Sequence, residues 1–518
     1  MTVILLILTA AAVGAGLARW RKLPLVPLLI LSGIGIAALD LTIEPGLYQD
    51  ALLLGLAFLV FSFGTEMNPA RVGKQGQAAV IVGLLQFASL AAVGFGAAYL
   101  LGFDWLTGLY IALAVAASST LVVLQLLKQR QRLYEPFGRL VVGVLLIQDF
   151  LIILFIAALA GVEQGAGAIF VSVNGTLGLV LLAYLIQRWV APWLFVVSNL
   201  SQEEQLLAVL AILFLFIGAS DLIGVPIVIG AFLAGVSLSS FPVSGIFRGQ
   251  AASLTDFFLA LFFVALGATL NWPNWRELTL AILLAGLVLA VTPVLVAVVA
   301  RRAGVGTRSA LESGFLLAQT SEFSIIVGLI GVQLGHLDGR ILSVITLVTI
   351  TTMIATPFVA TDAMAVRLLH WWARWRRAET DVPFDNHVLL LGCGDHGFEL
   401  LQWLLEHEQQ VAVVDDDSAV IRRAREVGAV GVRGDAIDPF VLRQARADKA
   451  RVIVSTLHRP QSNAQLLKLV NVPTLFSVFE PEEARQLADA GGFPILESYG
   501  AANKLIEWFE EWEARSEK

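Results

Sequence analysis

Long apolar runs dominate the chain up to about residue 365 and alternate with short polar connections. Each run spans roughly 17–25 residues, the length that an α-helix needs to cross the ~30 Å hydrocarbon layer of a membrane. The pattern predicts about thirteen membrane spans, at residues 2–18, 24–41, 50–64, 77–101, 106–127, 138–161, 168–190, 203–219, 222–240, 255–270, 277–300, 308–334 and 341–362. No basic residue precedes the first run, so we interpret it as a span rather than a cleaved signal peptide.

Basic residues are concentrated in every second connection between these spans, at Arg19, Arg21, Lys22, Arg71, Lys74, Lys128, Arg130, Arg132, Arg139, Arg188, Arg248, Arg301, Arg302 and Arg308. The intervening connections carry only Arg276 and Arg340, together with several acids. Positively charged connections face the cytoplasm in membrane proteins. We therefore expect an odd number of spans in a bacterial inner membrane, with the N-terminus outside and the C-terminus in the cytoplasm.

Composition supports a membrane protein with a soluble C-terminal part. The 518 residues are 57% hydrophobic and only 14% charged, whereas soluble domains carry roughly 25% charged residues. Residues 1–365 form the predicted membrane domain. Residues 366–384 are rich in tryptophan and arginine, which predicts an interfacial helix that anchors the chain or transmits motion. Strands and helices alternate over residues 385–500, and a further helix is expected within residues 501–518.

Two pairs of segments lie about seven spans apart, an offset that reverses direction in the membrane and predicts an inverted repeat. Phe58–Asn68 resembles Phe262–Asn271, and the polar break Ala116–Thr120 has a counterpart in Gln319–Phe323. The alternatives are chance similarity and hydroxyl groups that bond back to their own helix. Polar groups at mid-membrane are costly unless they meet a partner or a cavity. We therefore favour two unwound helices that meet at an ion site.

Asp149 lies near the middle of the sixth predicted span, next to Gln148. A carboxylate at that depth is costly unless it is protonated, paired or coordinating a cation. A group that holds either a proton or a cation, but not both, is what obligatory exchange requires. The structural alternative is a carboxylate locked to a hydroxyl group or a helix end.

These segments together resemble the second monovalent cation/proton antiporter family, and most closely the Kef-type potassium efflux systems. The resemblance extends over essentially the whole chain and rests on the order of the Gln148-Asp149 pair, the Ser-Ser-Thr break, the Ser-Glu-Phe segment and the run Phe61–Glu66. It implies a polytopic α-helical protein with inverted repeats and two crossed discontinuous helices. It also implies a homodimer in which a core domain moves against a scaffold domain.

On this resemblance Asp149 binds the proton or the cation, with Gln148 as its neutral neighbour. A single acid beside an amide implies electroneutral exchange of potassium for protons by alternating access of the elevator type. The residues implied to line the site are Ser118, Ser119, Thr120, Ser321 and Glu322, with Glu66 as a candidate in the surrounding layer. Ser321 stands where the family commonly has glycine, and Thr65 replaces the usual leucine, so the choice between potassium and sodium stays open.

The soluble part begins with a predicted strand, His387–Leu391, that is followed by a glycine-rich turn, Gly392-Cys-Gly-Asp-His-Gly397, and a helix. The second strand ends at Asp415, 18 residues after Gly397 (415 − 397). Glycines at this spacing allow a tight turn and close approach of a pyrophosphate, and an acid about 20 residues on contacts a ribose. We therefore expect nucleotide contacts at Gly392, Gly394, Asp395, His396, Gly397, Asp415 and Asp416. The lone cysteine, Cys393, is expected to be buried and inert rather than a redox switch.

Three further segments, Val430–Asp435, Val452–Thr456 and Thr474–Phe479, resemble the N-terminal lobe of the regulator-of-potassium-conductance (RCK, or TrkA-N) family. This Rossmann-like α/β lobe implies that Asp435 and Thr456 also face a nucleotide. Arg459-Pro460 stands where the family usually has an acid. Both NAD(H) and AMP therefore remain candidate ligands, and a further small-molecule regulator is left open.

The sequence thus favours an antiporter whose partners are potassium or sodium, protons, membrane lipids and a second copy, and not nucleic acid. A channel gated by the same lobe would need a filter such as Thr-Val-Gly-Tyr-Gly, which the sequence lacks. A membrane-tethered NAD-dependent oxidoreductase would need a catalytic acid or base beyond the nucleotide fold. We therefore predict a transporter without enzymatic activity or catalytic cofactor.

Overall fold

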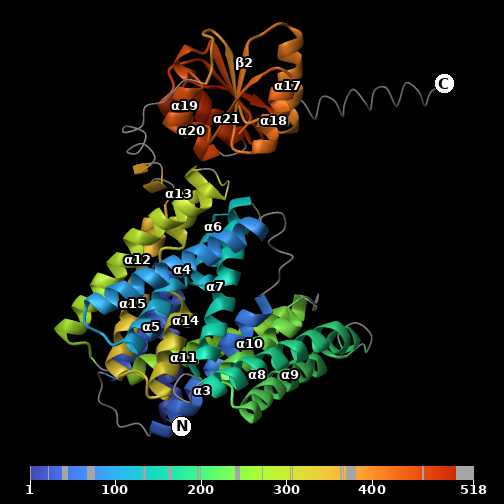
Figure 1. The fold of residues 1–518 in the computed structure, drawn as a ribbon. Helices are drawn as coiled ribbons and strands as arrows, with labels where there is room; N and C mark the ends of the chain where they lie inside the picture. The colour runs from blue at the N-terminus through green and yellow to red at the C-terminus, as the bar shows by residue number, and fades with distance from the viewer. Residues whose placement is uncertain are drawn as a thin grey trace. The chain divides into compact units, whose positions relative to one another are not determined.

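The computed structural model of the chain consists of two compact units (Figure 1). The first comprises Met1–Ala303 and Glu312–Thr361, and the second comprises Gly304–Leu311 and Asp362–Lys518. The described residues are 2–21, 23–37, 45–66, 76–130, 132–133, 136–160, 166–194, 198, 200–239, 245–270, 272–303, 305, 307–361, 364–365, 367–368, 381–457 and 460–497. Most of the expected interfacial helix, the expected helix in 501–518, Arg459 and the side chains of Glu66 and Asp395 lie outside them.

The first unit is helical throughout its described part. Its helices are α1 (Thr2–Arg21), α2 (Leu25–Ala37), α3 (Pro45–Glu66), α4 (Gly76–Leu100), α5 (Trp105–Ala116), α6 (Thr120–Gln129), α7 (Pro136–Ala160), α8 (Ala166–Leu185), α9 (Gln202–Ile223), α10 (Ile227–Leu238), α11 (Gly245–Thr269), α12 (Trp275–Arg302), α13 (Thr307–Leu316), α14 (Glu322–Gln333) and α15 (Gly339–Val359). The start of α13, residues 307–311, is grouped with the second unit. A π-helical turn, Ile186–Val190, continues α8. Each predicted span coincides with one helix, or with two where a polar break was expected.

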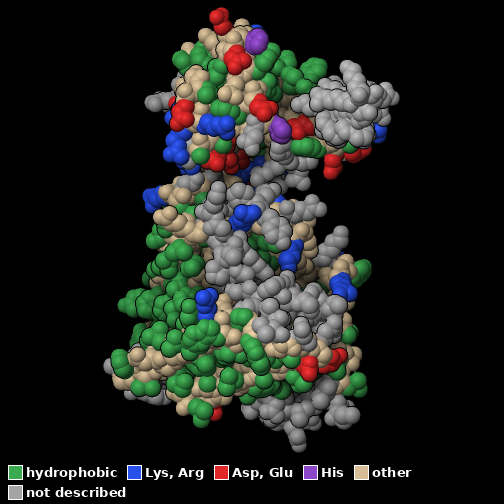
Figure 2. Space-filling view, turned by 90° about the vertical axis from the view of Figure 1, so that its right-hand side faces the viewer, with side chains coloured by type: hydrophobic (Ala, Val, Ile, Leu, Met, Phe, Trp, Pro, Cys, Tyr) green, Lys and Arg blue, Asp and Glu red, His purple; other side chains and the backbone are tan. Residues whose placement is uncertain are grey.

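The lengths and surfaces of these helices are those of membrane spans. Within the described residues, seven segments are long and apolar enough to cross a membrane, and one of them joins α5 and α6. Leu100 and Leu222 are 87% and 89% exposed, which is costly in water but suits contact with lipid tails. Hydrophobic side chains cover much of the visible face of this unit, whereas charged side chains are frequent on the second unit (Figure 2).

The helices of the first unit pack into two groups. In one group α1, α2, α3, α9, α10 and α11 contact one another, and in the other α4, α5, α7, α12, α14 and α15 do so. The packing repeats within each group: α2 packs on α11 as α10 packs on α3, and α4 packs on α7 as α12 packs on α15. These contacts of helices in the first half of the chain are therefore repeated by their counterparts in the second half. This equivalence confirms the predicted repeat.

Paired glycines mark the two closest crossings. A Cβ added to Gly33 of α2 would lie 2.9 Å from the Cα of Gly267 of α11, and a Cβ on Gly64 of α3 would lie 2.9 Å from the Cα of Gly235 of α10. Each added Cβ would also lie within 2.0–2.2 Å of a carbonyl oxygen on the facing helix. Small residues let helix backbones touch in a membrane, where packing rather than the hydrophobic effect holds helices together. Any side chain at these four positions would separate the helices.

The second unit is a doubly wound α/β fold, with six parallel strands in the order β3-β2-β1-β4-β5-β6. The strands are β1 (Val388–Leu391), β2 (Val411–Asp415), β3 (Val430–Arg433), β4 (Val452–Ser455), β5 (Thr474–Val478) and β6 (Phe493–Leu496). The helices are α17 (Asp395–Glu406), α18 (Ser418–Glu426), α19 (Pro439–Gln444), α20 (Pro460–Leu469) and α21 (Pro481–Asp489). This is the strand order of dinucleotide-binding folds. It confirms the predicted Rossmann-like lobe and adds an edge strand, β6, that the sequence pattern did not reveal.

Apolar side chains of successive strand residues fill the two faces of this sheet. Leu389 and Leu391 of β1 belong to one buried cluster, and Val388 and Leu390 belong to the other. Strands that are buried on both faces read as continuous apolar runs, as β1 does. The rigid sheet holds the turn after β1 and the end of β2 at one edge, because the carboxyl ends of parallel strands lie together.

Candidate functional site

The fifth and twelfth predicted spans are each interrupted by a short non-helical segment. Residues 117–119 separate α5 from α6, and residues 317–321 separate α13 from α14. Ser119 caps α6 by accepting a hydrogen bond from the Val122 N–H at 3.3 Å. Ser321 caps α14 by accepting one from the Phe323 N–H at 3.2 Å. Two capped helix N-termini, which carry partial positive charge, therefore lie inside the helical unit. The two breaks agree with the sequence prediction.

The first break is held by the two polar residues of α7. The Ser118 N–H donates to Gln148 Oε1 at 3.0 Å, and Thr120 Oγ1 donates to Asp149 Oδ2 at 2.9 Å. Gln148 is fully buried and Asp149 is only 2% exposed. The hydroxyl of Ser118 donates to the Leu317 carbonyl at 2.7 Å, which joins the first break to the second. Of the predicted lining residues of the first break, Thr120 thus contacts Asp149 and Ser118 contacts its neighbour Gln148.

Glu322 joins the caps of both breaks. Its Oε1 accepts a hydrogen bond from Ser119 Oγ at 2.5 Å, and its Oε2 accepts one from Ser321 Oγ at 3.3 Å. The side chain is fully buried. Each serine hydroxyl therefore accepts from its own helix and donates to the same carboxyl group. Ser321, the residue expected to be glycine, adds a hydrogen bond to this junction.

The arrangement suits reversible binding of a monovalent cation or a proton. Hydroxyl, carbonyl and carboxylate oxygens converge where two helices are unwound, and such sites coordinate sodium ions or protons in transporters. Among the described residues, no group of three or more His, Cys, Asp or Glu side chains could hold a metal ion. A buried carboxylate becomes neutral when it carries either one proton or one monovalent ion, and neutrality lowers the cost of its burial.

Sequence reasoning placed Thr320 within the second polar break without assigning it to the site, and it missed Thr349 and Thr352 of α15. Thr320 lies in the break itself, and its N–H and hydroxyl contact Thr352 and Thr349 of α15. The signal in the sequence is a set of threonines spaced three or four apart in the last span. Hydroxyl groups in an apolar helix usually bond back to their own carbonyls, so this spacing alone did not indicate a contact with the break.

In the second unit, the glycine-rich turn between β1 and α17 is built as predicted. Gly392 has a φ of +80°, and a Cβ added there would lie 2.9 Å from Thr456 Oγ1. A Cβ on Gly397 would lie 3.0 Å from the Gly392 carbonyl oxygen. Gly394 caps α17, and nothing lies within 4 Å of the place its Cβ would take. The turn therefore requires glycine at two positions and leaves open space at the third, at the N-terminus of a helix where phosphates bind.

The predicted residues Asp415, Thr456 and Asp435 differ in how closely they approach the glycine-rich turn. Asp415 accepts hydrogen bonds from the Cys393 and Asp417 N–H groups, both at 2.8 Å, which uses two of its roughly four acceptor positions. Thr456 Oγ1 donates to the Gly392 carbonyl at 3.0 Å. Asp435 follows β3 at the same edge of the sheet, and its Oδ1 accepts from the Ile437 N–H at 3.0 Å. The structure brings Asp415 and Thr456 into the turn itself. The side chains of His396 and Asp416 are exposed.

Cys393 is buried within the glycine-rich turn, 3% exposed, as the sequence predicts. Burial, and next the nearby Asp415 carboxylate, raise the pKa of the thiol from its usual 9.0 to about 11. The reactive thiolate is therefore roughly 100-fold scarcer at neutral pH than for a free cysteine. We expect iodoacetamide at pH 7.5 to modify the folded protein much more slowly than the protein unfolded in guanidinium, as followed by intact-mass spectrometry. Equal rates in the two states would contradict this placement.

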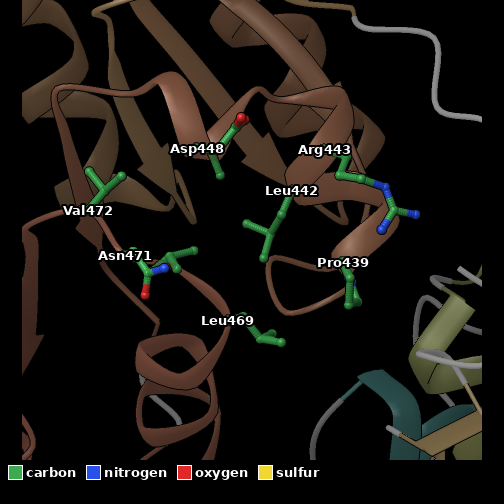
Figure 3. A pocket seen from close by; sticks show the side chains of 9 residues that line it. Pro439, Leu442, Arg443, Asp448, Leu469, Asn471 and Val472 are labelled. Atoms are coloured by element: carbon green, nitrogen blue, oxygen red, sulfur yellow. The ribbon is translucent and has the colours of Figure 1, made fainter. Parts of the chain in front are cut away.

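A cavity of about 550 Å³ lies elsewhere in the second unit (Figure 3). Its walls come from α19, the turn before β4 and the segment before β5, and include Leu442, Arg443, Asp448 and Asn471. Because the strands are parallel, the segments that enter β4 and β5 lie at the opposite edge of the sheet from the glycine-rich turn. This cavity is therefore separate from the nucleotide-binding loop, and no sequence motif indicated it.

A helical membrane unit with two broken spans, joined in one chain to a dinucleotide-type fold, defines an ion-exchanging secondary transporter with a nucleotide-binding lobe. Residues 4–361 match the family described as sodium/hydrogen exchanger, transmembrane, and residues 388–492 match the TrkA-N domain. The first match covers more than half of the chain. The protein therefore belongs to the sodium/hydrogen exchanger family, and it is a multi-pass membrane cation/proton antiporter regulated by a TrkA-N domain.

Individual proteins agree with this assignment. The chain is 29% identical over 429 residues to the glutathione-regulated potassium-efflux system protein KefC of Cronobacter sakazakii, covering 80% of this chain and 68% of the relative. It is 28% identical over 428 residues to the protein of the same name from an Enterobacter species, with the same coverage. The solved sodium proton antiporter MjNhaP1 from Methanocaldococcus jannaschii shares the fold, with a TM-score of 0.56, 16% identity, and coverage of 71% of this chain and 99% of that one.

Proposed function

We propose that this antiporter exchanges potassium for protons, with Asp149 as the group that binds each in turn. The supporting observation is the burial of Asp149 against Thr120 at the first break. Gln148, Ser118, Ser119, Ser321 and Glu322 lie around the same junction and supply oxygen ligands or hold them in place. Relatives at 28–29% identity are named as potassium-efflux systems, which favours potassium over sodium.

The charge of the site implies electroneutral exchange. Asp149 is neutral when protonated and when paired with one monovalent cation, and its neighbour Gln148 carries no charge in either state. Glu322 is assigned one charge state throughout the cycle. The unoccupied carboxylate is costly in the membrane interior. Reorientation of the site from one side to the other is therefore favoured only when a proton or a cation is bound. One cation then moves for each proton.

The TrkA-N lobe is a nucleotide-binding fold, and NAD(H) and AMP are our candidate ligands. The glycine-rich turn leaves open space beside Gly394 for a phosphate, and Asp415 keeps acceptor capacity for ribose hydroxyls. We assign the exposed His396 and Asp416, together with Asp395 and Asp435, to the rim of this site, and Thr456 to its glycine-rich turn. A bound nucleotide controls exchange, and a second small-molecule regulator of the lobe belongs to the same proposal.

We assign residues 1–365 to the antiporter domain, 366–384 to an interfacial helix, 385–500 to the lobe and 501–518 to a terminal helix. The charge pattern favours insertion into a bacterial inner membrane with the lobe in the cytoplasm. We also assign the protein a homodimeric state in contact with membrane lipids. Glu66 stays a candidate for the layer around the cation site. Because its relatives are transporters, the chain is assigned no enzymatic activity.

The test is proton flux in liposomes that contain the purified protein and a pH-sensitive dye. Potassium, sodium and rubidium are compared at equal concentrations, with and without an imposed membrane potential. We expect potassium to drive the fastest flux and the membrane potential to leave the initial rate unchanged. Faster flux with sodium would reject potassium selectivity, and a rate that follows the potential would reject electroneutral exchange.

A further inference from the structure

Helix α15 presents four threonines, Thr346, Thr349, Thr352 and Thr356, to the interior of the helical unit. All four are fully buried. Each hydroxyl donates to the carbonyl four residues earlier in the same helix, at 2.8–2.9 Å. In an apolar helix this back-bonding satisfies the hydroxyl proton without any outside partner. Its consequence is that the oxygen lone pairs remain available as acceptors.

Two of these threonines use their lone pairs to hold the second break. The Thr320 N–H donates to Thr352 Oγ1 at 3.1 Å, and Thr320 Oγ1 donates to Thr349 Oγ1 at 3.0 Å. The direction of these bonds follows from the back-bonding, because the hydroxyl protons of α15 are already directed to α15 carbonyls. Thr320 immediately precedes Ser321, the cap of α14. Its backbone N–H lies outside any helix, and an unsatisfied N–H within a membrane is costly.

In the first repeat, the corresponding contacts with the break are made by different side chains. There α7 holds the first break, with Gln148 accepting from the Ser118 N–H and Asp149 accepting from the Thr120 hydroxyl. In both repeats, then, the helix after the interrupted span, α7 or α15, accepts one backbone N–H and one threonine hydroxyl. The acceptor of the threonine hydroxyl in the first repeat is ionisable, whereas both acceptors in the second repeat are hydroxyls that keep their protons at neutral pH.

We propose that Thr349 and Thr352 are positioning residues of the transport site. They fix the second break through Thr320, so that the adjacent Ser321 and Glu322 keep their junction with the first break while Asp149 changes its charge. The second break thus keeps its structure during exchange, while Asp149 at the first break binds and releases the proton and the cation. This inference rests on the proposed role of Asp149 in binding the proton and the cation.

The test compares three substitutions on α15 in the full-length protein in liposomes. Thr352→Val removes the acceptor of the Thr320 N–H but keeps the shape of the side chain, and Thr352→Ser keeps the acceptor. Thr346→Val is the matched control, because Thr346 has the same burial and back-bond but does not contact Thr320 in the described hydrogen bonds. For each variant, the apparent KM for potassium, the maximal rate and the pH profile of exchange are measured.

We expect Thr352→Val to raise the apparent KM about tenfold, as loss of one well-formed interaction would, and to shift the pH profile. Thr352→Ser and Thr346→Val should stay close to wild type. Equal KM values and pH profiles for Thr352→Val and Thr346→Val would overturn the proposal, as would failure of serine to restore the wild-type KM. If Thr352→Val does not assemble, Thr349→Val replaces it, because this variant leaves the Thr320 N–H bonded. An increase in the apparent KM of Thr349→Val would support the proposal, and a wild-type KM would overturn it.

The variant Asp149→Asn tests the proposed transport site independently of the positioning role of Thr349 and Thr352. Exchange that survives Asp149→Asn would remove the proposed site altogether. Loss of exchange in Asp149→Asn, combined with wild-type kinetics in Thr352→Val, would leave the site in place and reject the positioning role alone.

Discussion

Replacing Asp149 with asparagine is expected to reduce cation/proton exchange to the level of empty liposomes while leaving the protein assembled. The asparagine amide oxygen can still accept the hydrogen bond from Thr120 that holds the first break. Assembly and helix packing should therefore be retained. The amide can neither take up a proton nor neutralise a cation, so neither loaded state of the site can form. Proton flux in response to a potassium gradient measures the loss.

Asp338→Asn is the matched control for this experiment. Asp338 caps α15 by accepting from the Arg340 N–H at 3.3 Å, at an exposed helix end away from the breaks. Its replacement removes one negative charge without touching the candidate site, and exchange should continue at the wild-type rate. Substantial exchange in Asp149→Asn, with a normal pH dependence, would show that another group carries the proton.

Gly394→Val is expected to weaken nucleotide binding by at least about tenfold, which corresponds to about 1.4 kcal/mol. The fold tolerates a side chain at Gly394, because nothing lies within 4 Å of its Cβ position. The same open space is where a phosphate would approach the N-terminus of α17. The added side chain therefore competes with the ligand rather than with the protein. Isothermal titration of the full-length protein with NADH, NAD and AMP measures the change.

Two further variants make this experiment specific. Gly286→Ala, which also has open space but lies in α12 of the helical unit, should bind nucleotide as the wild type does. Gly392→Ala should instead destabilise the lobe, because its φ of +80° and the contact with Thr456 disfavour any side chain. Unchanged affinity in Gly394→Val for all three nucleotides would reject the glycine-rich turn as the binding loop.

The sequence was sufficient for features that depend on local pattern. Apolar length predicted the spans, and polar residues at matched positions of the repeat, near Ser119 and Ser321, predicted the two interruptions, because polar groups at mid-membrane are costly unless they meet a partner or a cavity. The glycine spacing and Asp415 predicted the nucleotide fold. Strand β6 was missed because it is short and contains Pro494, and proline lowers the expectation of a strand.

Features that depend on contacts between distant segments could not be predicted in the same way. The roles of Glu322 were left open, and only the fold brings Ser119 within 2.5 Å of it. Thr349 and Thr352 read as ordinary members of an apolar helix, because their back-bonds need no partner outside it. Their contact with Thr320 depends on where α15 packs. The cavity beside Leu442 likewise results from packing between turns and carries no motif.

The paired glycine crossings also determine where this protein can deform. At Gly33–Gly267 and Gly64–Gly235 backbone lies against backbone, so neither helix of a pair can slide or rotate past the other without a collision. Helices α2, α3, α10 and α11 consequently behave as one stiff frame. On the proposed elevator mechanism, we expect the displacement that carries an ion across the membrane to occur between this frame and the helices that hold Asp149. In that mechanism the frame is the fixed support and the ion-binding helices are the moving part.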